Sequence, residues 1–237
     1  MPTPLPMSIE LALRLTEVLL GLALLQHSLE HLAIHPQDKR LFGMRALLAG
    51  MLILGIAPLL VCLALVALSL VLLRRFDGPY NGGADRMSLL ILLCLCGAHG
   101  APTPYWQEIA LGYLAVQLVL SYAISGGVKL INCDWRNGTA LRDVFLFSAY
   151  PASEAHRDWA QRPRVLFLMA WLIIIFELIF PLALLSQPLL IAALVLAAVF
   201  HLANGVLFGL NRFIWAWIAS YPSVLWLQNR IEGTVLA

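Results

Sequence analysis

Two ionisable side chains lie inside long apolar segments, where a charge is costly unless it is paired or takes part in chemistry. Glu177 is in the middle of Trp171-Leu-Ile-Ile-Ile-Phe-Glu-Leu-Ile-Phe180, and Lys129 ends the apolar segment 109–129. A charged side chain at the centre of a lipid bilayer costs at least about 2.5–3.5 kcal/mol. Glu177 is therefore either the partner of a basic residue on a neighbouring helix or a group that handles protons.

Lys129 follows two glycines, Gly126 and Gly127, which allow close helix contact or local unwinding. An amine held in an apolar medium loses part of its preference for the charged form. Such an amine can act as a base near neutral pH. The alternative is a lysine at a helix end whose ammonium group reaches the membrane interface.

His201 and Asn204 are three residues apart in the apolar segment 188–211, so they share one face of a helix. They can present two hydrogen-bonding groups to a single pocket. The alternative is a structural histidine whose ring N–H donates a hydrogen bond to a neighbouring backbone carbonyl.

The segment 76–85 is rich in turn-forming residues and ends on Asp85. Asp85 is expected near the start of a helix, where the helix dipole favours an anion. The stretch Asn81-Gly82-Gly83 can bring backbone N–H groups close to a ligand, although such turns usually have no further role.

His27, His31 and His35 recur every four residues, and the first two share a helical face that a zinc or iron site can use. Pro36 ends that helix, and no other cluster completes a ligand shell. We therefore expect the polar end of a helix at the interface, and no metal site.

The composition of the chain predicts that transmembrane helices position these residues. Charged residues make up 12% of the 237 residues and hydrophobic residues 61%, with a mean hydropathy of +0.86. A soluble domain carries about 25% charged residues. These values exclude soluble, disordered and nucleic-acid-binding classes, and they predict an all-α, polytopic transmembrane bundle.

We expect about six spans, because a span needs about 20 apolar residues. The segments are 9–34, 46–73, 87–100, 109–129, 165–186 and 188–211. The segment 46–73 has 28 residues without a charge and is expected to form one tilted span, kinked at Pro58. The Trp-rich stretch 213–227 is expected to form an interfacial helix. Residues 1–237 are then a single membrane domain with no soluble domain.

The six-span map predicts that both termini are cytoplasmic. Ten Lys and Arg residues lie in the loops 74–86 and 130–164 and the C-terminal tail, on the side of the N-terminus. The opposite loops carry three, Lys39, Arg40 and Arg45. The positive-inside rule places the side with ten in the cytoplasm. No basic segment precedes the first apolar stretch, so we expect an uncleaved first helix.

Several stretches together resemble a known family. They are Tyr122-Ala-Ile-Ser-Gly-Gly-Val-Lys129 with Asp134-Trp135-Arg-Asn-Gly138, Phe200-His-Leu-Ala-Asn-Gly-Val-Leu-Phe208 with Ala219-Ser-Tyr-Pro222, Glu177 in the preceding span, and Gly78-Pro-Tyr-Asn-Gly-Gly-Ala-Asp85. Over residues 74–226 the chain resembles horizontally transferred transmembrane (HTTM) domain proteins, the bacterial relatives of vitamin K-dependent γ-carboxylase.

The resemblance implies base chemistry on a reduced quinone of the vitamin K type, in a bacterial inner membrane. In the carboxylase, a lysine deprotonates the quinol; oxygenation then gives a strong base that removes a glutamate γ-proton, and CO2 adds. Lys129 matches that lysine and His201 the histidine of the second stretch, with Glu177 as a third catalytic residue. The implied substrate-binding residues are Asn204, Asp85, Asp134 and Trp135.

The sequence departs from the carboxylase in two features that bear on glutamate carboxylation and not on the quinone chemistry. The carboxylase has a further histidine in the region matching 81–85 and a large soluble domain for its peptide substrate, and neither has a counterpart in this sequence. The expected partners are the bilayer and a lipid-like small molecule. The alternative function is a non-enzymatic subunit that assembles a complex with a membrane protein partner, its polar residues joining helices. A transporter using Glu177 is disfavoured because no inverted repeat is visible.

Overall fold

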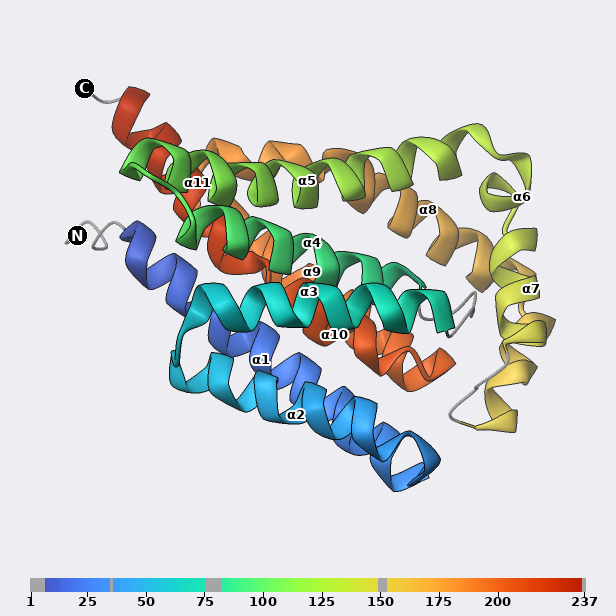
Figure 1. Ribbon diagram of the computed structural model, residues 1–237. Coiled ribbons are helices and arrows are strands. Elements are labelled where there is room, and N and C mark those ends of the chain that lie inside the picture. Colours follow the sequence, from blue (N-terminus) through green and yellow to red (C-terminus); the bar gives the residue numbers. More distant parts are fainter. Residues whose placement is uncertain (1–6, 35, 76–81, 149–152, 236–237) are drawn as a thin grey trace. The chain divides into compact units, whose positions relative to one another are not determined.

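The computed structural model describes residues 7–34, 36–75, 82–148 and 153–235, and every regular element among them is helical (Figure 1). This confirms the predicted all-α class. The chain divides into two compact units. Unit 1 comprises Met1–Val116 and Arg212–Ala237, and unit 2 comprises Gln117–Asn211.

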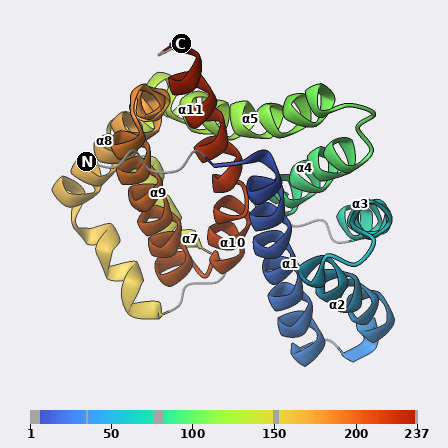
Figure 2. The same ribbon diagram turned by 90° about the vertical axis from the view of Figure 1, so that its left-hand side faces the viewer.

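Unit 1 contains the N-terminal helices and the C-terminal ones. They are α1 (Ile9–Ile34), α2 (Lys39–Leu54), α3 (Pro58–Arg75), α4 (Gly82–His99), the first part of α5 (Pro104–Ile131), α10 (Asn211–Ile218) and α11 (Tyr221–Val235). α1 and α2 lie side by side in both ribbon views (Figure 2). Gly21 permits this approach, because a Cβ atom there would lie 2.6 Å from Cγ1 of Ile53.

The expected single span over 46–73 is wrong, because two helices occupy it. α2 ends at Gly55, which has a φ of 72° and donates its N–H to the carbonyl of Leu52. A left-handed glycine with this bonding pattern closes a helix. Pro58 then begins α3 instead of kinking a continuous helix, since the first helical position needs no N–H donor.

The beginning of α2 and the end of α3 lie at the same end of unit 1. Asp38 precedes α2, and its Oδ1 lies 2.7 Å from Nη2 of Arg75 in the last turn of α3. Asp38 also lies 3.2 Å from His31 near the end of α1. The expected placement of Arg75 and Lys39 on opposite sides of the membrane is therefore wrong.

Unit 2 contains the rest of α5, α6 (Cys133–Arg136), α7 (Thr139–Phe147), a 3₁₀ helix (Glu154–Gln161), α8 (Pro163–Ile179) with a 3₁₀ extension (Phe180–Leu185), and α9 (Gln187–Phe208). Buried Phe145, Leu166 and Phe208 form part of one core that joins α7, α8 and α9. Gly138 has a φ of 84°, and a Cβ atom there would lie 3.0 Å from the backbone nitrogen of Phe167. This close contact fixes the turn into α7 against α8.

Four segments among the described residues are long and apolar enough to cross a membrane: Pro58–Arg75, Pro104–Ile131, Pro163–Leu185 and Gln187–Phe208. α1 and α4, which match the expected spans 9–34 and 87–100, are not among them. Six spans are therefore not confirmed. The stretch 213–227 is divided between α10 and α11, so a single Trp-rich interfacial helix is not confirmed either.

Candidate functional site

One face of α5 carries three polar side chains of unit 2. Tyr122, Ser125 and Lys129 are separated by three and four residues, the spacing that places side chains on one helical face. About 10 Å of helix separates Tyr122 from Lys129 along the axis. The face therefore presents a phenol, a hydroxyl and an amine in a row.

α8 approaches this face most closely at Gly126. A Cβ atom at Gly126 would lie 2.8 Å from the backbone nitrogen of Leu178 and 3.0 Å from Cβ of Glu177. Of the two alternatives, close helix contact and local unwinding, the structure shows close contact at Gly126 within a continuous α5. A Cβ at Gly127 would meet nothing within 4 Å. The contact at Gly126 brings the carboxylate of α8 within reach of the amine of α5.

Lys129 and Glu177 form an ion pair inside unit 2. Nζ of Lys129 lies 2.7 Å from Oε2 and 2.8 Å from Oε1 of Glu177. It also donates to the hydroxyl of Ser125 at 2.5 Å, and that hydroxyl donates to Oε1 at 3.3 Å. Glu177 is only 3% exposed. The ammonium of Lys129 is thus directed to a buried carboxylate rather than to the membrane interface.

Trp135 adds an aromatic surface beside the amine. Its ring centroid lies 5.1 Å from Nζ of Lys129, within the range of a cation–π contact. Asn132 caps the short helix that carries Trp135 by accepting the N–H of Asp134 at 2.8 Å. Asp134 itself is exposed. Of this predicted pair, Trp135 contacts Lys129, whereas Asp134 lies on the surface of unit 2.

His201 pairs with Tyr122 rather than with Lys129. The hydroxyl of Tyr122 lies 2.9 Å from Nε2 of His201, and both residues are buried. The ring of Tyr122 stacks on Phe180 at a centroid distance of 4.1 Å. Tyr122 and Ser125 were not singled out from the sequence, although their spacing from Lys129 was a usable signal.

Asn204 lies one turn beyond His201 on α9 and is half-buried. Its backbone carbonyl accepts the N–H of Leu210 at 3.3 Å, which helps to end the helix. The described contacts of Asn204 are therefore those of a helix terminus.

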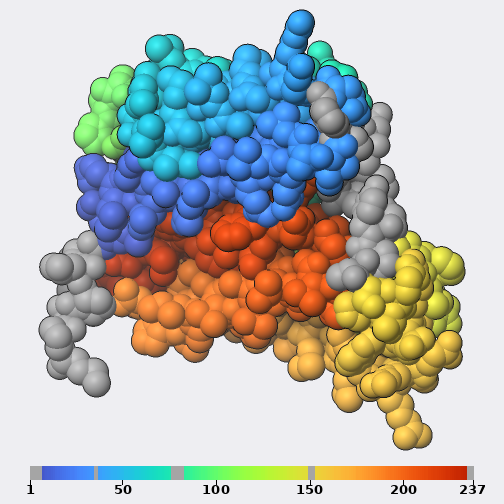
Figure 3. Space-filling view, turned by 90° about the horizontal axis from the view of Figure 1, so that it is seen from below, coloured from blue at the N-terminus to red at the C-terminus, as the bar shows by residue number. Residues whose placement is uncertain are grey.

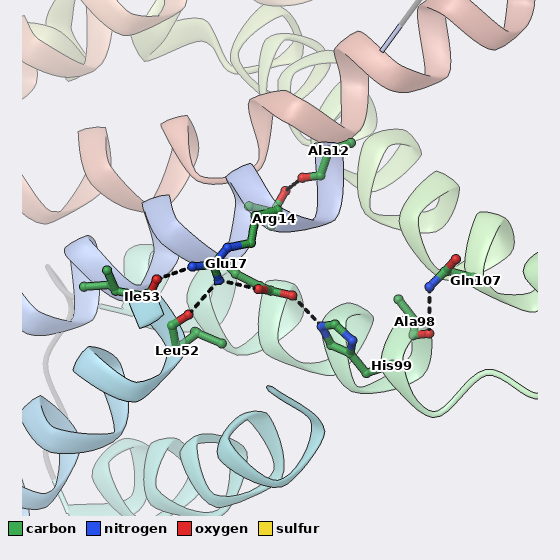
Figure 4. A network of polar contacts seen from close by, with 9 residues as sticks. Ala12, Arg14, Glu17, Leu52, Ile53, Ala98, His99 and Gln107 are labelled. Atoms are coloured by element: carbon green, nitrogen blue, oxygen red, sulfur yellow. Dashed lines mark hydrogen bonds and ion pairs between the residues drawn. The ribbon is translucent and has the colours of Figure 1, made fainter. Parts of the chain in front are cut away.

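A second buried polar network lies in unit 1 (Figure 4). Glu17 is 4% exposed, and its two oxygens lie 2.7 Å from Arg14 and 2.5 Å from Nε2 of His99. Arg14 also donates to the carbonyls of Leu52 and Ile53, which satisfies the C-terminal end of α2. Glu17 is an acidic residue in the apolar segment 9–34, and nothing in the spacing of that segment indicates His99 as its partner.

Among the described residues, no group of three His, Cys, Asp or Glu side chains is placed so that it can hold a metal ion. His27 accepts a hydrogen bond from Arg45, and His31 pairs with Asp38. His35 and residues 76–81, where turn-forming residues were noted, lie outside the described residues.

Asp85 lies in the first turn of α4, where it was predicted. It belongs to unit 1, and it lines a small cavity there together with Arg45. Burial raises the pKa of Asp85. The structure thus brings Lys129, Glu177 and Trp135 together, joins His201 to the same face of α5 through Tyr122, and assigns Asp85 to the other unit.

Comparison with known proteins gives one match. The family model of the HTTM domain matches residues 96–228, more than half of the chain. The match includes Lys129, Glu177 and His201, whereas Asp85 precedes it. No curated protein and no solved structure matches the chain.

Proposed function

Because the chain belongs to the HTTM domain family, we propose that it is a multi-pass protein of the bacterial inner membrane, with about six spans, that performs base-catalysed chemistry on a reduced quinone or another isoprenoid lipid. The reaction is an oxidation or epoxidation in which molecular oxygen is the oxidant, or a carboxylation that this oxidation drives. The observation that carries the proposal is the buried pair of Lys129 and Glu177.

Membrane insertion is supported by the outer face of α8. Exposed apolar side chains recur at helical spacing along it, namely Leu168, Leu172, Ile175 and Ile179. This stripe lies on a helix with one buried carboxylate on its inner face. Such a helix suits contact with lipid on one side and with a polar partner on the other.

In this pair Lys129 is the base, and Glu177 is the group that accepts the proton that the amine must first lose. An amine is basic only when it has lost its proton, and the oxygens of Glu177 at 2.7 and 2.8 Å are close enough to take it. Moving the proton from Lys129 to Glu177 turns an ion pair into a neutral amine and a carboxylic acid. A medium of low polarity favours the neutral form. Ser125 holds the amine in position.

Tyr122 and His201 provide a second proton-sharing pair on the same face of α5. One proton lies between a phenol and an imidazole, so the pair can stabilise a negative charge that develops nearby. Asn204 and Trp135 complete the polar and aromatic surroundings that the proposal assigns to substrate binding.

The residues fit a reduced quinone by their chemistry. A bound reduced quinone would supply an acidic phenolic hydroxyl group and two reducing electrons. The amine of Lys129 accepts such a proton, and the ring of Trp135 beside it offers an aromatic surface.

The test measures oxidation of reduced vitamin K by the purified full chain in lipid nanodiscs. We expect Lys129→Met and Glu177→Gln each to lower the rate by about 100-fold or more, because a general base contributes about that factor. Arg142→Gln, which removes an exposed ion pair of α7, is the matched control and should retain the rate. An inactive wild-type protein, or an active Lys129→Met variant, would overturn the proposal.

The alternative, a non-enzymatic subunit, is favoured by one observation: the pair Lys129–Glu177 joins α5 to α8 with every oxygen of the carboxylate in contact. A double variant, Lys129→Met with Glu177→Leu, distinguishes the two. Apolar residues often replace a buried ion pair without loss of stability. A folded double variant without quinol oxidation supports the enzyme, whereas one that still co-purifies with a fixed membrane partner and keeps its cellular role supports the subunit.

A further inference from the structure

A cavity of about 80 Å³ lies in unit 1 between α1, α2, α3, α4 and α10. A smaller one of about 20 Å³ shares four of its lining residues, His27, Arg45, Asp85 and Arg212. The surface of α1 (dark blue) meets that of the C-terminal helices (red) in Figure 3. A single water needs about 10–15 Å³, so the larger cavity has room for a small polyatomic group.

Arg45 is the most unusual residue of this cavity, because it is charged and only 3% exposed. Burial lowers its pKa to about 10, which leaves it charged at neutral pH. Its Nη1 donates to Nδ1 of His27 at 2.9 Å, and its buried Nε has no hydrogen-bond partner among the described residues. None of the described ion pairs within 4.0 Å involves Arg45.

The hydrogen bond to Arg45 also fixes the tautomer of His27. A guanidinium group only donates, so Nδ1 of His27 must accept, and the ring proton is on Nε2. His27 therefore contributes a second donor to the same cavity.

The lining residues that the structure describes include two guanidinium groups, those of Arg45 and Arg212, and the carboxylate of Asp85. Asp38 lies nearby, but it pairs with His31 and Arg75 instead of Arg45. An oxyanion in the cavity would pair with the buried guanidinium group of Arg45.

The cavity lies at the depth of a span end. Leu72, which lines it, is in the last turn of α3, and Arg74 and Arg75 complete that turn. α3 is one of the four segments able to cross a membrane. The end of such a segment lies at the level of the lipid headgroups, where phosphodiester groups are abundant.

We propose that this cavity is a binding site for a phosphate-type oxyanion, with Arg45, Arg212 and Nε2 of His27 as donors. The guanidinium fork matches the geometry of phosphate oxygens. The group comes either from the phosphodiester of an anionic lipid or from free phosphate. This site is separate in sequence and in chemistry from the pair Lys129–Glu177.

The experiment measures thermal unfolding of the full chain in a neutral detergent against increasing inorganic phosphate or short-chain phosphatidylglycerol. A ligand that binds the folded state raises the midpoint with concentration, and the rise gives a dissociation constant. We expect a saturable rise with at least one probe. A rise with phosphatidylglycerol alone identifies the lipid as the source, and a rise with phosphate alone identifies the free ion.

Three variants test the site, because one should weaken binding of the probe, one should strengthen it and one should leave it unchanged. Arg212→Gln should weaken binding about tenfold, because it removes a charge-assisted contact. Asp85→Asn should strengthen binding by several-fold, because it removes the repelling charge, and a merely structural effect would not do so. Arg86→Gln changes the net charge equally on an exposed side chain next to Asp85 and should leave binding unchanged.

The proposal is overturned if neither probe raises the midpoint of the wild-type protein. It is also overturned if Arg86→Gln weakens binding as much as Arg212→Gln, or if Asp85→Asn does not strengthen it. None of these readouts depends on quinol oxidation, so the outcome is independent of the proposed function.

Discussion

At the scale of single side chains, Tyr122 makes a hydrogen bond that is abolished when its one oxygen atom is deleted. Its hydroxyl lies 2.9 Å from Nε2 of His201 in the interior of unit 2. Tyr122→Phe keeps the ring that stacks on Phe180 and loses the hydrogen bond. We expect the free energy of unfolding to fall by about 1–3 kcal/mol, because a buried polar atom loses this partner. Thermal unfolding in detergent, followed with a thiol-reactive dye that detects buried Cys62 and Cys94, measures the change.

Tyr105→Phe is the matched control, because Tyr105 is exposed and its substitution should change the stability by no more than about 0.5 kcal/mol. Exposed Cys133 is replaced by serine in both proteins to lower the background. Equal stability of the two variants would show that the Tyr122–His201 bond contributes nothing.

At this scale the sequence identified the residues but not their partners. Glu177 and Lys129 are conspicuous because each is ionisable in an apolar segment. A basic partner for Glu177 was one of two alternatives, and the structure provides it as Lys129. Which face of α8 turns toward α5 depends on packing along both helices, so spacing within one segment cannot specify the pair. The same holds for His99, whose partner Glu17 is on another helix.

At the scale of helices, Gly126 and Gly127 form a matched pair of positions on α5. Gly126→Ala places a Cβ atom 2.8 Å from the backbone of Leu178, so α5 and α8 must separate. Overpacking of this kind costs about 1–3 kcal/mol. We also expect the variant to lose quinol oxidation in nanodiscs, because the same movement lengthens the contact between Lys129 and Glu177.

Gly127→Ala should have the opposite effect and raise the free energy of unfolding. Nothing lies within 4 Å of its Cβ position, and alanine is about 1 kcal/mol more favourable than glycine inside a helix. The thiol-reactive unfolding assay compares both variants with the wild-type protein. Stabilisation by both substitutions would contradict the close contact of α5 with α8.

Helix positions were predictable where the apolar pattern had clear ends. The segments expected at 165–186 and 188–211 match Pro163–Leu185 and Gln187–Phe208 closely. The turn between α2 and α3 was missed because Gly55, Ile56 and Ala57 are as apolar as their surroundings. Hydropathy therefore does not reveal the turn. Gly55 adopts its left-handed conformation because the chain reverses direction between α2 and α3.

At the scale of the whole chain, membrane insertion follows from composition, whereas orientation depends on how many helices cross. The six-span map counted Lys39 and Arg75 on opposite sides. The ion pair between Asp38 and Arg75 places the start of α2 and the end of α3 at one end of unit 1. Lys39, Arg40, Arg74 and Arg75 therefore gather at that end. The predicted cytoplasmic location of both termini loses this part of its support.

The gathered cations lead to a labelling prediction. By the positive-inside rule, we expect this end of unit 1 to face the cytoplasm. Lys39→Cys and Arg74→Cys, both at exposed positions, should react with an impermeant maleimide from the cytoplasmic side. Ile56→Cys, at the other end of α3, should react from the opposite side, because α3 is long enough to cross. The background protein carries serine in place of Cys133. Labelling of Lys39→Cys and Arg74→Cys from opposite faces would contradict the shared end, and labelling of all three from one face would exclude α3 as a span.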